Sequence, residues 1–151
     1  MTQRADILVD ALNFDPPAVI GGHDPKGLPL YRLPTHGRVV ASFKNFGPTR
    51  ASDVNWDFVP VVDGVTAKTP DEPYQHPVVI IPAGDHIKPS TGPISAYYDP
   101  SVVSLISKGD KELRVKATIT YRDVFGAVHH TTQFGTYFNG TFRIDDNIDA
   151  D

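Results

Sequence analysis

The chain has 151 residues, of which 40% are hydrophobic and 21% are charged, and it contains no cysteine. Its 14 Lys and Arg are scattered among 18 Asp and Glu, giving a formal charge of −4 and no dense basic patch for a nucleic-acid partner. The composition therefore predicts one globular domain and excludes disulfides and thiolate metal sites. No apolar run approaches the roughly 20 residues of a membrane-spanning helix, so the chain as given is predicted to be soluble.

Short apolar segments bounded by Gly, Pro, Asn or Asp run through the first half of the chain and predict strands. Between the first two segments, Gly21, Gly22 and Gly27 lie in a proline-rich stretch that lacks the strand and helix required around a phosphate-binding loop. This stretch is predicted to be a long connection. The predicted strands are Ile7–Phe14, Arg38–Phe46, Asn55–Val62 and Pro77–Ile81.

The stretch KNFGPTRASDV, residues 44–54, separates two of these strands. Asn45 can hydrogen-bond to neighbouring backbone, and Gly47 with Pro48 turns the chain. Asn and Gly beside strands are more often turn residues than ligand contacts, so the stretch is interpreted as a strand-to-strand corner rather than a binding loop. Trp56 follows on the next strand and is assigned to the core with Phe43 and Phe58.

One short helix is predicted at Asp99–Lys108. Asp99 can cap its N-terminus, Pro100 suits the first helical position and Gly109 ends it. We expect this helix to form a crossover between strands.

Strict alternation from Lys111 to Arg122 predicts the longest strand, with one face in the core and one in water. Asp123-Val124-Phe125-Gly126 is predicted as a four-residue hairpin loop, with Asp123 capping the turn and Gly126 taking a positive φ. The next strand then pairs so that Arg122 faces Ala127, Tyr121 faces Val128 and Val115 faces Phe134.

In this register His130 lies on the core side opposite Ile119, and His129 lies outside opposite Thr120. A bulge would exchange the two faces. The polar side of the hairpin is then a threonine-rich face with a basic edge, and it is the candidate surface for contact with a protein partner. Its residues are Arg114, Lys116, Thr118, Thr120, Arg122, His129, Thr131, Gln133 and Tyr137.

Two segments resemble motifs of a known class of domain. The first, Asn45-x-Gly47-x-Thr49-x-Ala51-x-x-Val54, resembles the N-x-G-x-T-P-A-x-x-V corner of immunoglobulin-like domains in bacterial envelope proteins, including the cell-adhesion-related type; Arg50 stands where proline is usual. The second, Tyr121–Gly126 followed by a histidine, Thr131 and Phe134, resembles the Y-x-D-x-F-G-x-x-H-x-T-x-F hairpin of bacterial membrane-anchored proteins. The likeness spans nearly the whole chain.

The resemblance, together with about seven strands and no βα alternation, implies an all-β, antiparallel, immunoglobulin-like two-layer sandwich at residues 1–144. An acidic tail at 145–151 is expected to be disordered. The resemblance further implies the soluble part of an extracytoplasmic bacterial envelope protein, tethered through a segment absent from this chain. It assigns no ligand, and Asn45, Gly47, Asp123 and Gly126 are expected to be structural.

We therefore expect a non-catalytic protein-interaction or assembly module without metal or cofactor. One alternative is a metal-dependent binder or enzyme that uses His129, His130 and the loop histidines; cysteine and the usual paired-histidine spacings are absent. A second alternative is carbohydrate binding through Tyr97 and Tyr98. Asn139-Gly140-Thr141 fits a glycosylation acceptor but is interpreted as a turn. The loop histidines are His23, His36, His76 and His86.

Overall fold

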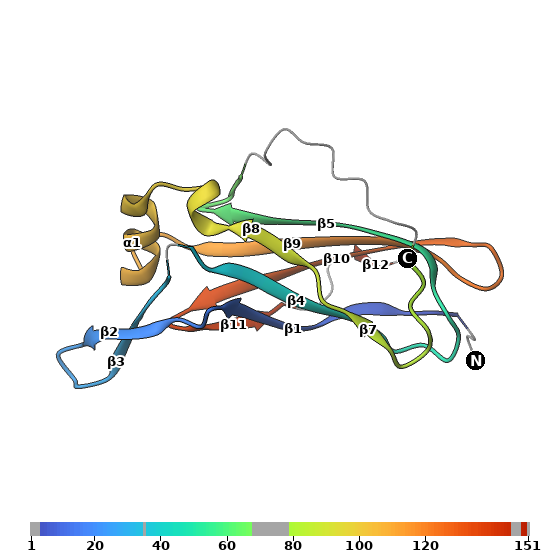
Figure 1. Ribbon diagram of the computed structural model, residues 1–151, viewed down its shortest axis with the longest axis horizontal. Helices are drawn as coiled ribbons and strands as arrows, with labels where there is room; N and C mark the ends of the chain where they lie inside the picture. The colour runs from blue at the N-terminus through green and yellow to red at the C-terminus, as the bar shows by residue number, and fades with distance from the viewer. Residues whose placement is uncertain (1–3, 35, 68–78, 146–148, 151) are drawn as a thin grey trace.

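The computed structural model describes residues 4–34, 36–67, 79–145 and 149–150. They form antiparallel β-structure with one α-helix and one 3-10 turn, which confirms the all-β prediction (Figure 1). The strands are β1 (Ile7–Asp15), β2 (Val19–His23), β3 (Pro29–Arg32), β4 (Arg38–Asn45), β5 (Ser52–Val62), β6 (Val65–Thr66), β7 (His86–Ile87), β8 (Ser90–Pro93), β9 (Leu113–Arg122), β10 (Val128–Phe138), β11 (Thr141–Ile144) and β12 (Asp149–Ala150).

Two sheets face each other, and a third, two-stranded sheet extends from them (Figure 1). The smaller facing sheet has the order β1-β4-β7, with β8 also paired to β4. The larger has the order β11-β10-β9-β5-β6, with β12 also paired to β10. The two-stranded sheet, β2 with β3, projects beyond the main body as an arm. Two of the pairs, β5 with β9 and β9 with β10, are the longest ladders in the structure.

The core lies between the two facing sheets because alternate residues of β1, β4, β9 and β10 point inward. Phe43 on β4 meets Trp56 and Phe58 on β5 edge-on, with ring centroids 6.4 and 6.1 Å apart. Phe14 on β1 meets Tyr137 on β10 in the same way at 5.7 Å. These contacts bridge the sheets, and they confirm that Trp56 packs against the core.

The α-helix α1 spans Pro100–Lys108, directly after the 3-10 turn η1 (Ile94–Ala96). Asp99 is its N-cap, and Gly109 ends it in the left-handed region with φ 83°. The helix carries the chain from β8 in one sheet to β9 in the other, as expected. The described residues contain no helix with the length and hydropathy of a membrane span.

Two segments differ from the sequence prediction. The stretch around Gly21 and Gly27 is not a connection but the β2–β3 arm, whose strands pair from Val19 with Arg32 to His23 with Pro29. Of the predicted strand Pro77–Ile81, residues 77 and 78 lie outside the described part, and Ile81 makes only an isolated bridge to Ala51.

The β9–β10 register is shifted by one residue from the prediction. Asp123 pairs with Ala127, so the loop has three residues rather than four, with Gly126 at φ 86° closing it. Arg122 consequently faces Val128, and His129 faces Tyr121. A one-residue slip exchanges the faces of the whole strand. The prediction that His130 faces the core was therefore wrong, because His129 does.

Candidate functional site

The corner after β4 is built around the side chain of Asn45, which is fully buried. Its amide oxygen accepts hydrogen bonds from the backbone N–H of Asp6 and Gly47, at 3.1 and 3.0 Å. Its amide nitrogen donates to the carbonyls of Thr49 and Ile81, at 2.8 and 3.0 Å. The full hydrogen-bonding capacity of this side chain is thus used inside the protein. It ties the start of β1 to the corner, and no donor remains for a ligand.

Gly47 serves the same corner through its missing side chain. A Cβ at this position would lie 2.4 Å from the carbonyl oxygen of Arg4 and 2.8 Å from the Cα of Ala5. The backbone of the N-terminal segment can therefore pass over the corner only where residue 47 is glycine.

The β9–β10 loop is held by the carboxylate of Asp123. Oδ1 accepts hydrogen bonds from the backbone N–H of Phe125 and Ala127, at 2.9 and 3.0 Å. The backbone closes the same loop, with Asp123 N–H donating to Ala127 O at 2.9 Å and Gly126 N–H to Asp123 O at 3.1 Å. Short-range hydrogen bonds of this kind fix the turn geometry.

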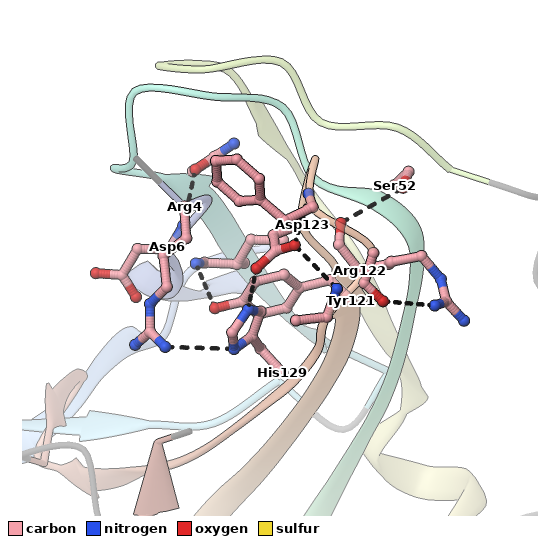
Figure 2. A network of polar contacts seen from close by, with 12 residues as sticks. Arg4, Asp6, Ser52, Tyr121, Arg122, Asp123 and His129 are labelled. Carbon is pink, nitrogen blue, oxygen red and sulfur yellow. Dashed lines mark hydrogen bonds and ion pairs between the residues drawn. The ribbon is translucent and has the colours of Figure 1, made fainter. Parts of the chain in front are cut away.

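His129 connects this loop to the N-terminal segment (Figure 2). Its Nε2 lies 2.6 Å from Asp123 Oδ2, and its Nδ1 lies 3.3 Å from Nη1 of Arg4. A guanidinium has only donors, so Nδ1 must accept and Nε2 must carry the proton that is donated to Asp123. The side chains of His129 and Asp123 are only 9% and 4% exposed. The imidazole is thus a buried bridge with both nitrogens engaged.

Tyr121 completes the buried part of the cluster. Its ring lies beside that of His129, with centroids 5.5 Å apart, and its hydroxyl accepts a hydrogen bond from Ile7 N–H at 3.3 Å. Gln133 acts in the same way two residues further along β1, where its Oε1 accepts a hydrogen bond from Val9 N–H at 2.7 Å. These polar side chains of the larger sheet satisfy backbone donors of β1, the edge strand of the smaller sheet.

On the solvent side, Arg122 braces the loop. Its Nη1 donates to the carbonyl of Gly126 at 2.7 Å, and its Nε lies 3.4 Å from Asp53 Oδ2. Asp53 occupies the bulge of β5, with φ 49°. The loop backbone is therefore held from inside by Asp123 and from outside by Arg122.

The pKa values of two ionisable groups of the cluster are shifted. The hydrogen bond from His129 lowers the pKa of Asp123 despite its burial, and the N–H groups of Ala127 and Phe125 add to this. Burial raises the pKa of Tyr121. The cluster thus favours a charged carboxylate and a neutral phenol, and both states suit the hydrogen bonds described above.

At the protein surface, the β9–β10 loop carries a group of exposed apolar side chains. Val124, Phe125 and Val128 are 40%, 72% and 46% exposed. The exposed apolar surface of these side chains contributes no burial to the fold, and the backbone that carries it is fixed in position. We call Val124, Phe125 and Val128 the hairpin tip. Sequence reasoning missed it, although two apolar residues inside an Asp-x-x-Gly turn are a visible signal.

The nine residues predicted to share one polar face do not share it. The five from β9 lie on the outer side of the larger sheet, where Arg114 forms an ion pair with Asp145 at 2.9 Å and covers the ring of Phe134. The other four point into the protein, because the register differs by one residue from the prediction. These buried residues are His129, Thr131, Gln133 and Tyr137.

The histidines are not brought together. His130 lies outside beside Thr120, with Nδ1 and Oγ1 3.2 Å apart, while His129 is on the opposite face. His36 lies beside Ser95, and His76 lies outside the described residues. Within the described ranges, no group of three or more His, Asp or Glu is placed to hold a metal ion.

The two adjacent tyrosines have different surroundings. Tyr97 lines a cleft of about 430 Å³ between β5 and β8, together with Trp56, Arg38 and Asp57. Its hydroxyl accepts a hydrogen bond from Gly92 N–H at 3.1 Å. Tyr98 instead packs against the core, and burial raises its pKa.

The predicted turn at Asn139 is present as the two-residue connection between β10 and β11, with φ 40° at Asn139 and 98° at Gly140. The Asn139 amide is occupied: its oxygen accepts from Tyr31 N–H at 2.9 Å, and its nitrogen donates to Pro29 O at 3.0 Å. The side chain thereby fixes the β2–β3 arm to the main body.

Comparison of the chain with models of protein families, with curated proteins and with solved structures found no match.

Proposed function

We propose that this protein is a non-catalytic protein-interaction or assembly module, and that the hairpin tip is its contact surface. The proposal rests on one observation. Phe125 is 72% exposed, on a loop whose backbone is fixed by the buried pair Asp123 and His129. Aromatic side chains dominate the energetics of many interfaces, and a rigid loop loses little entropy on binding. The partner is a protein with an apolar pocket that takes this ring.

The chemistry of the cluster supports a structural use of its histidine. A general base needs a nitrogen lone pair directed at the proton it removes. In His129 the lone pair of Nδ1 faces Arg4, and the proton of Nε2 faces Asp123. Positioning the loop is therefore the role that these contacts favour over acid–base catalysis.

The wider setting of the proposal is an immunoglobulin-like domain that forms the soluble part of a bacterial envelope protein. Support comes from the Asn45-x-Gly47 corner and the Tyr121–Gly126 hairpin motif, both of which are built from residues with defined structural contacts. In this setting, partner binding occurs outside the cytoplasm.

Site-specific photo-cross-linking tests the contact surface. A photoreactive phenylalanine analogue is placed at position 125, and a matched variant carries it at Val65, which is 70% exposed on β6. In the producing cells, position 125 is expected to give discrete adducts with one protein, and excess unmodified protein should suppress them. Phe125→Ser as competitor should be at least about tenfold less effective, since an interface anchor is lost.

Equal cross-linking from positions 65 and 125, or equal competition by the wild type and Phe125→Ser, contradicts the proposed surface. The melting temperature of Phe125→Ser serves as the folding control. It should match the wild type, because the ring lies in water.

Carbohydrate binding is a second candidate, favoured by one observation. Trp56 and Tyr97 line the same cleft, with the charged side chains of Arg38 and Asp57 beside them. Aromatic rings offer apolar faces for sugar rings, and charged groups can bind their hydroxyls. The candidate predicts glycan-array binding that Tyr97→Ala abolishes and Tyr98→Phe leaves intact. Binding that survives Tyr97→Ala would reject this cleft as the sugar site.

A further inference from the structure

A second cleft lies between the β2–β3 arm and α1. Figure 1 shows these elements at the end of the molecule opposite the β9–β10 loop that carries the hairpin tip. It has a volume of about 410 Å³, within the range of pockets that bind small molecules. Leu30 and Leu33 line it from the arm side, and Pro100 and Val103 line it from the helix. Leu30 is 42% exposed, so the cleft leaves apolar surface in contact with water.

The walls of this cleft are fixed relative to each other by a hydrogen-bond relay. The backbone N–H of Leu33 donates to Ser107 Oγ at 3.1 Å, and Ser107 Oγ donates to the carbonyl of Val103 at 3.0 Å. The arm is also held from its other side by Asn139. The cleft is therefore preformed, and a ligand would enter it without first ordering its walls.

The charged groups of the cleft have one sign. Arg32 and Lys108 line it, and no acidic side chain does. Neither cation forms an ion pair with any residue in the described part of the chain. Lys108 complements the C-terminal end of the helix dipole, but Arg32 on β3 has no such role. An apolar floor with two unpaired cations is complementary to an anion that carries an apolar chain.

We propose that the cleft between α1 and the β2–β3 arm binds a single-chain carboxylate of the fatty-acid type. The alkyl chain packs on Leu30, Leu33 and Val103, and the carboxylate pairs with Arg32 and Lys108. This site lies away from the hairpin tip, and it neither requires nor supports the protein-interaction proposal.

Calorimetric titration of the intact protein with octanoate, decanoate and dodecanoate, each below its micellar concentration, tests the proposal. One molecule should bind per chain, and affinity should rise about fourfold for each added methylene until the cleft is full. Decanol, which has the same chain without the charge, should bind at least about tenfold more weakly. Amide resonances of Leu33 and α1 should shift on binding.

Three variants locate the site. Arg32→Gln and Lys108→Gln should each weaken decanoate about tenfold while leaving decanol unchanged. Ser104→Trp, at an exposed helix position on the cleft, should abolish binding of both by filling the space. Lys26→Gln removes an exposed cation at the arm's tip, outside the cleft, and should change nothing.

No saturable binding of any of the three carboxylates overturns the proposal. Binding that is equal for decanol and decanoate, or unchanged in Arg32→Gln and Ser104→Trp, overturns it as well, since either result shows attachment to other apolar surface. Preference for a peptide with an apolar C-terminal residue over all the alkyl carboxylates would assign the cleft to a protein ligand instead.

Discussion

Two hairpin loops with the same sequence pattern stand at opposite ends of the molecule (Figure 1). Asp24-Pro25-Lys26-Gly27 joins β2 to β3, and Asp123-Val124-Phe125-Gly126 joins β9 to β10. In each, the Asp N–H donates to the carbonyl four residues on, at 2.9 Å. In each, Oδ1 of the Asp accepts from the second and fourth following N–H groups, and Gly takes φ near 82° or 86°.

The loops differ in what surrounds the aspartate. Asp123 is buried, and its second oxygen meets His129 at 2.6 Å. Asp24 is only half-buried, and the residue that corresponds to His129 in the arm is Leu30. The same local chemistry therefore makes both turns, while the second turn is also held by contacts with the distant residues Arg4 and Asp53. The hydrogen bonds of the arm with Asn139 and Ser107 lie beyond its turn. A rigid loop that shows Phe125 to solvent is suited to recognition.

Replacing the bridging imidazole should have the largest effect. His129→Ala leaves the Asp123 carboxylate without its partner inside the protein, so we expect a loss of about 2 kcal/mol in the free energy of unfolding. Leu30→Ala, at the matching position of the arm, should cost less, about 1 kcal/mol or below, because Leu30 is 42% exposed and bonds no buried charge. Urea unfolding of the two variants measures both values. Similar losses would mean that the two loops are equally coupled to the fold.

Replacing the glycine of either loop, Gly126 or Gly27, should have the next largest effect on stability. Ala at position 126 or 27 must adopt a positive φ, which costs roughly 1 kcal/mol in either loop. Gly126→Ala should lower the melting temperature, because the loop is part of the rigid body. Gly27→Ala should lower it less, since Gly27 lies at the tip of the arm, beyond its hydrogen bonds with Asn139 and Ser107, and this tip can open locally. Thermal unfolding followed by circular dichroism measures both melting temperatures. Equal decreases in the two variants would contradict this prediction.

Acidification should reduce the stability that the Asp123 carboxylate in the β9–β10 loop gives to the fold. The pKa of Asp123 in the folded state lies below its unfolded value of about 3.9, so the carboxylate stabilises the fold above about pH 4. This contribution is lost as the pH falls through the folded pKa. The free energy of unfolding of Asp123→Asn should therefore decline less than that of the wild type between pH 5 and pH 2. The slope is reduced rather than abolished, because the pKa of Asp63 is also lowered.

Loss of the outermost contact should have the smallest effect. Arg4→Gln removes the 3.3 Å contact with Nδ1 of His129 but leaves the pair with Asp123 intact. We expect a change below about 1 kcal/mol, in line with other partly exposed charged contacts. A loss as large as that of His129→Ala would show that Arg4, rather than Asp123, is the main partner of the imidazole.

Sequence reasoning identified the elements better than their pairing. The alternation in β9 and the Pro-to-Gly bounds of α1 depend on neighbouring residues, so they could be predicted. The β9–β10 register depends on whether Ala127 pairs with Arg122 or with Asp123, and the prediction of Arg122 placed His129 on the wrong face. The Asp24–Gly27 pattern was available as a hairpin signal, but the prolines around it favoured a connection.

The contacts that define the candidate site lie beyond the reach of local patterns. Arg4 and His129 are 125 residues apart, and Gln133 satisfies a donor of β1 from the other sheet. Only the packing of two sheets brings such residues together. For the same reason, the cleft between the β2–β3 arm and α1 could not be predicted, since neither the arm nor its position was expected.

Amide hydrogen exchange followed by NMR compares the two loops most directly. The N–H groups of Phe125 and Ala127 make the same bonds to Asp123 that Lys26 and Leu28 make to Asp24. If distant contacts lock only the β9–β10 loop, exchange at Phe125 and Ala127 should be at least about tenfold slower after correction for intrinsic rates. Equal protection in the two loops would contradict this account.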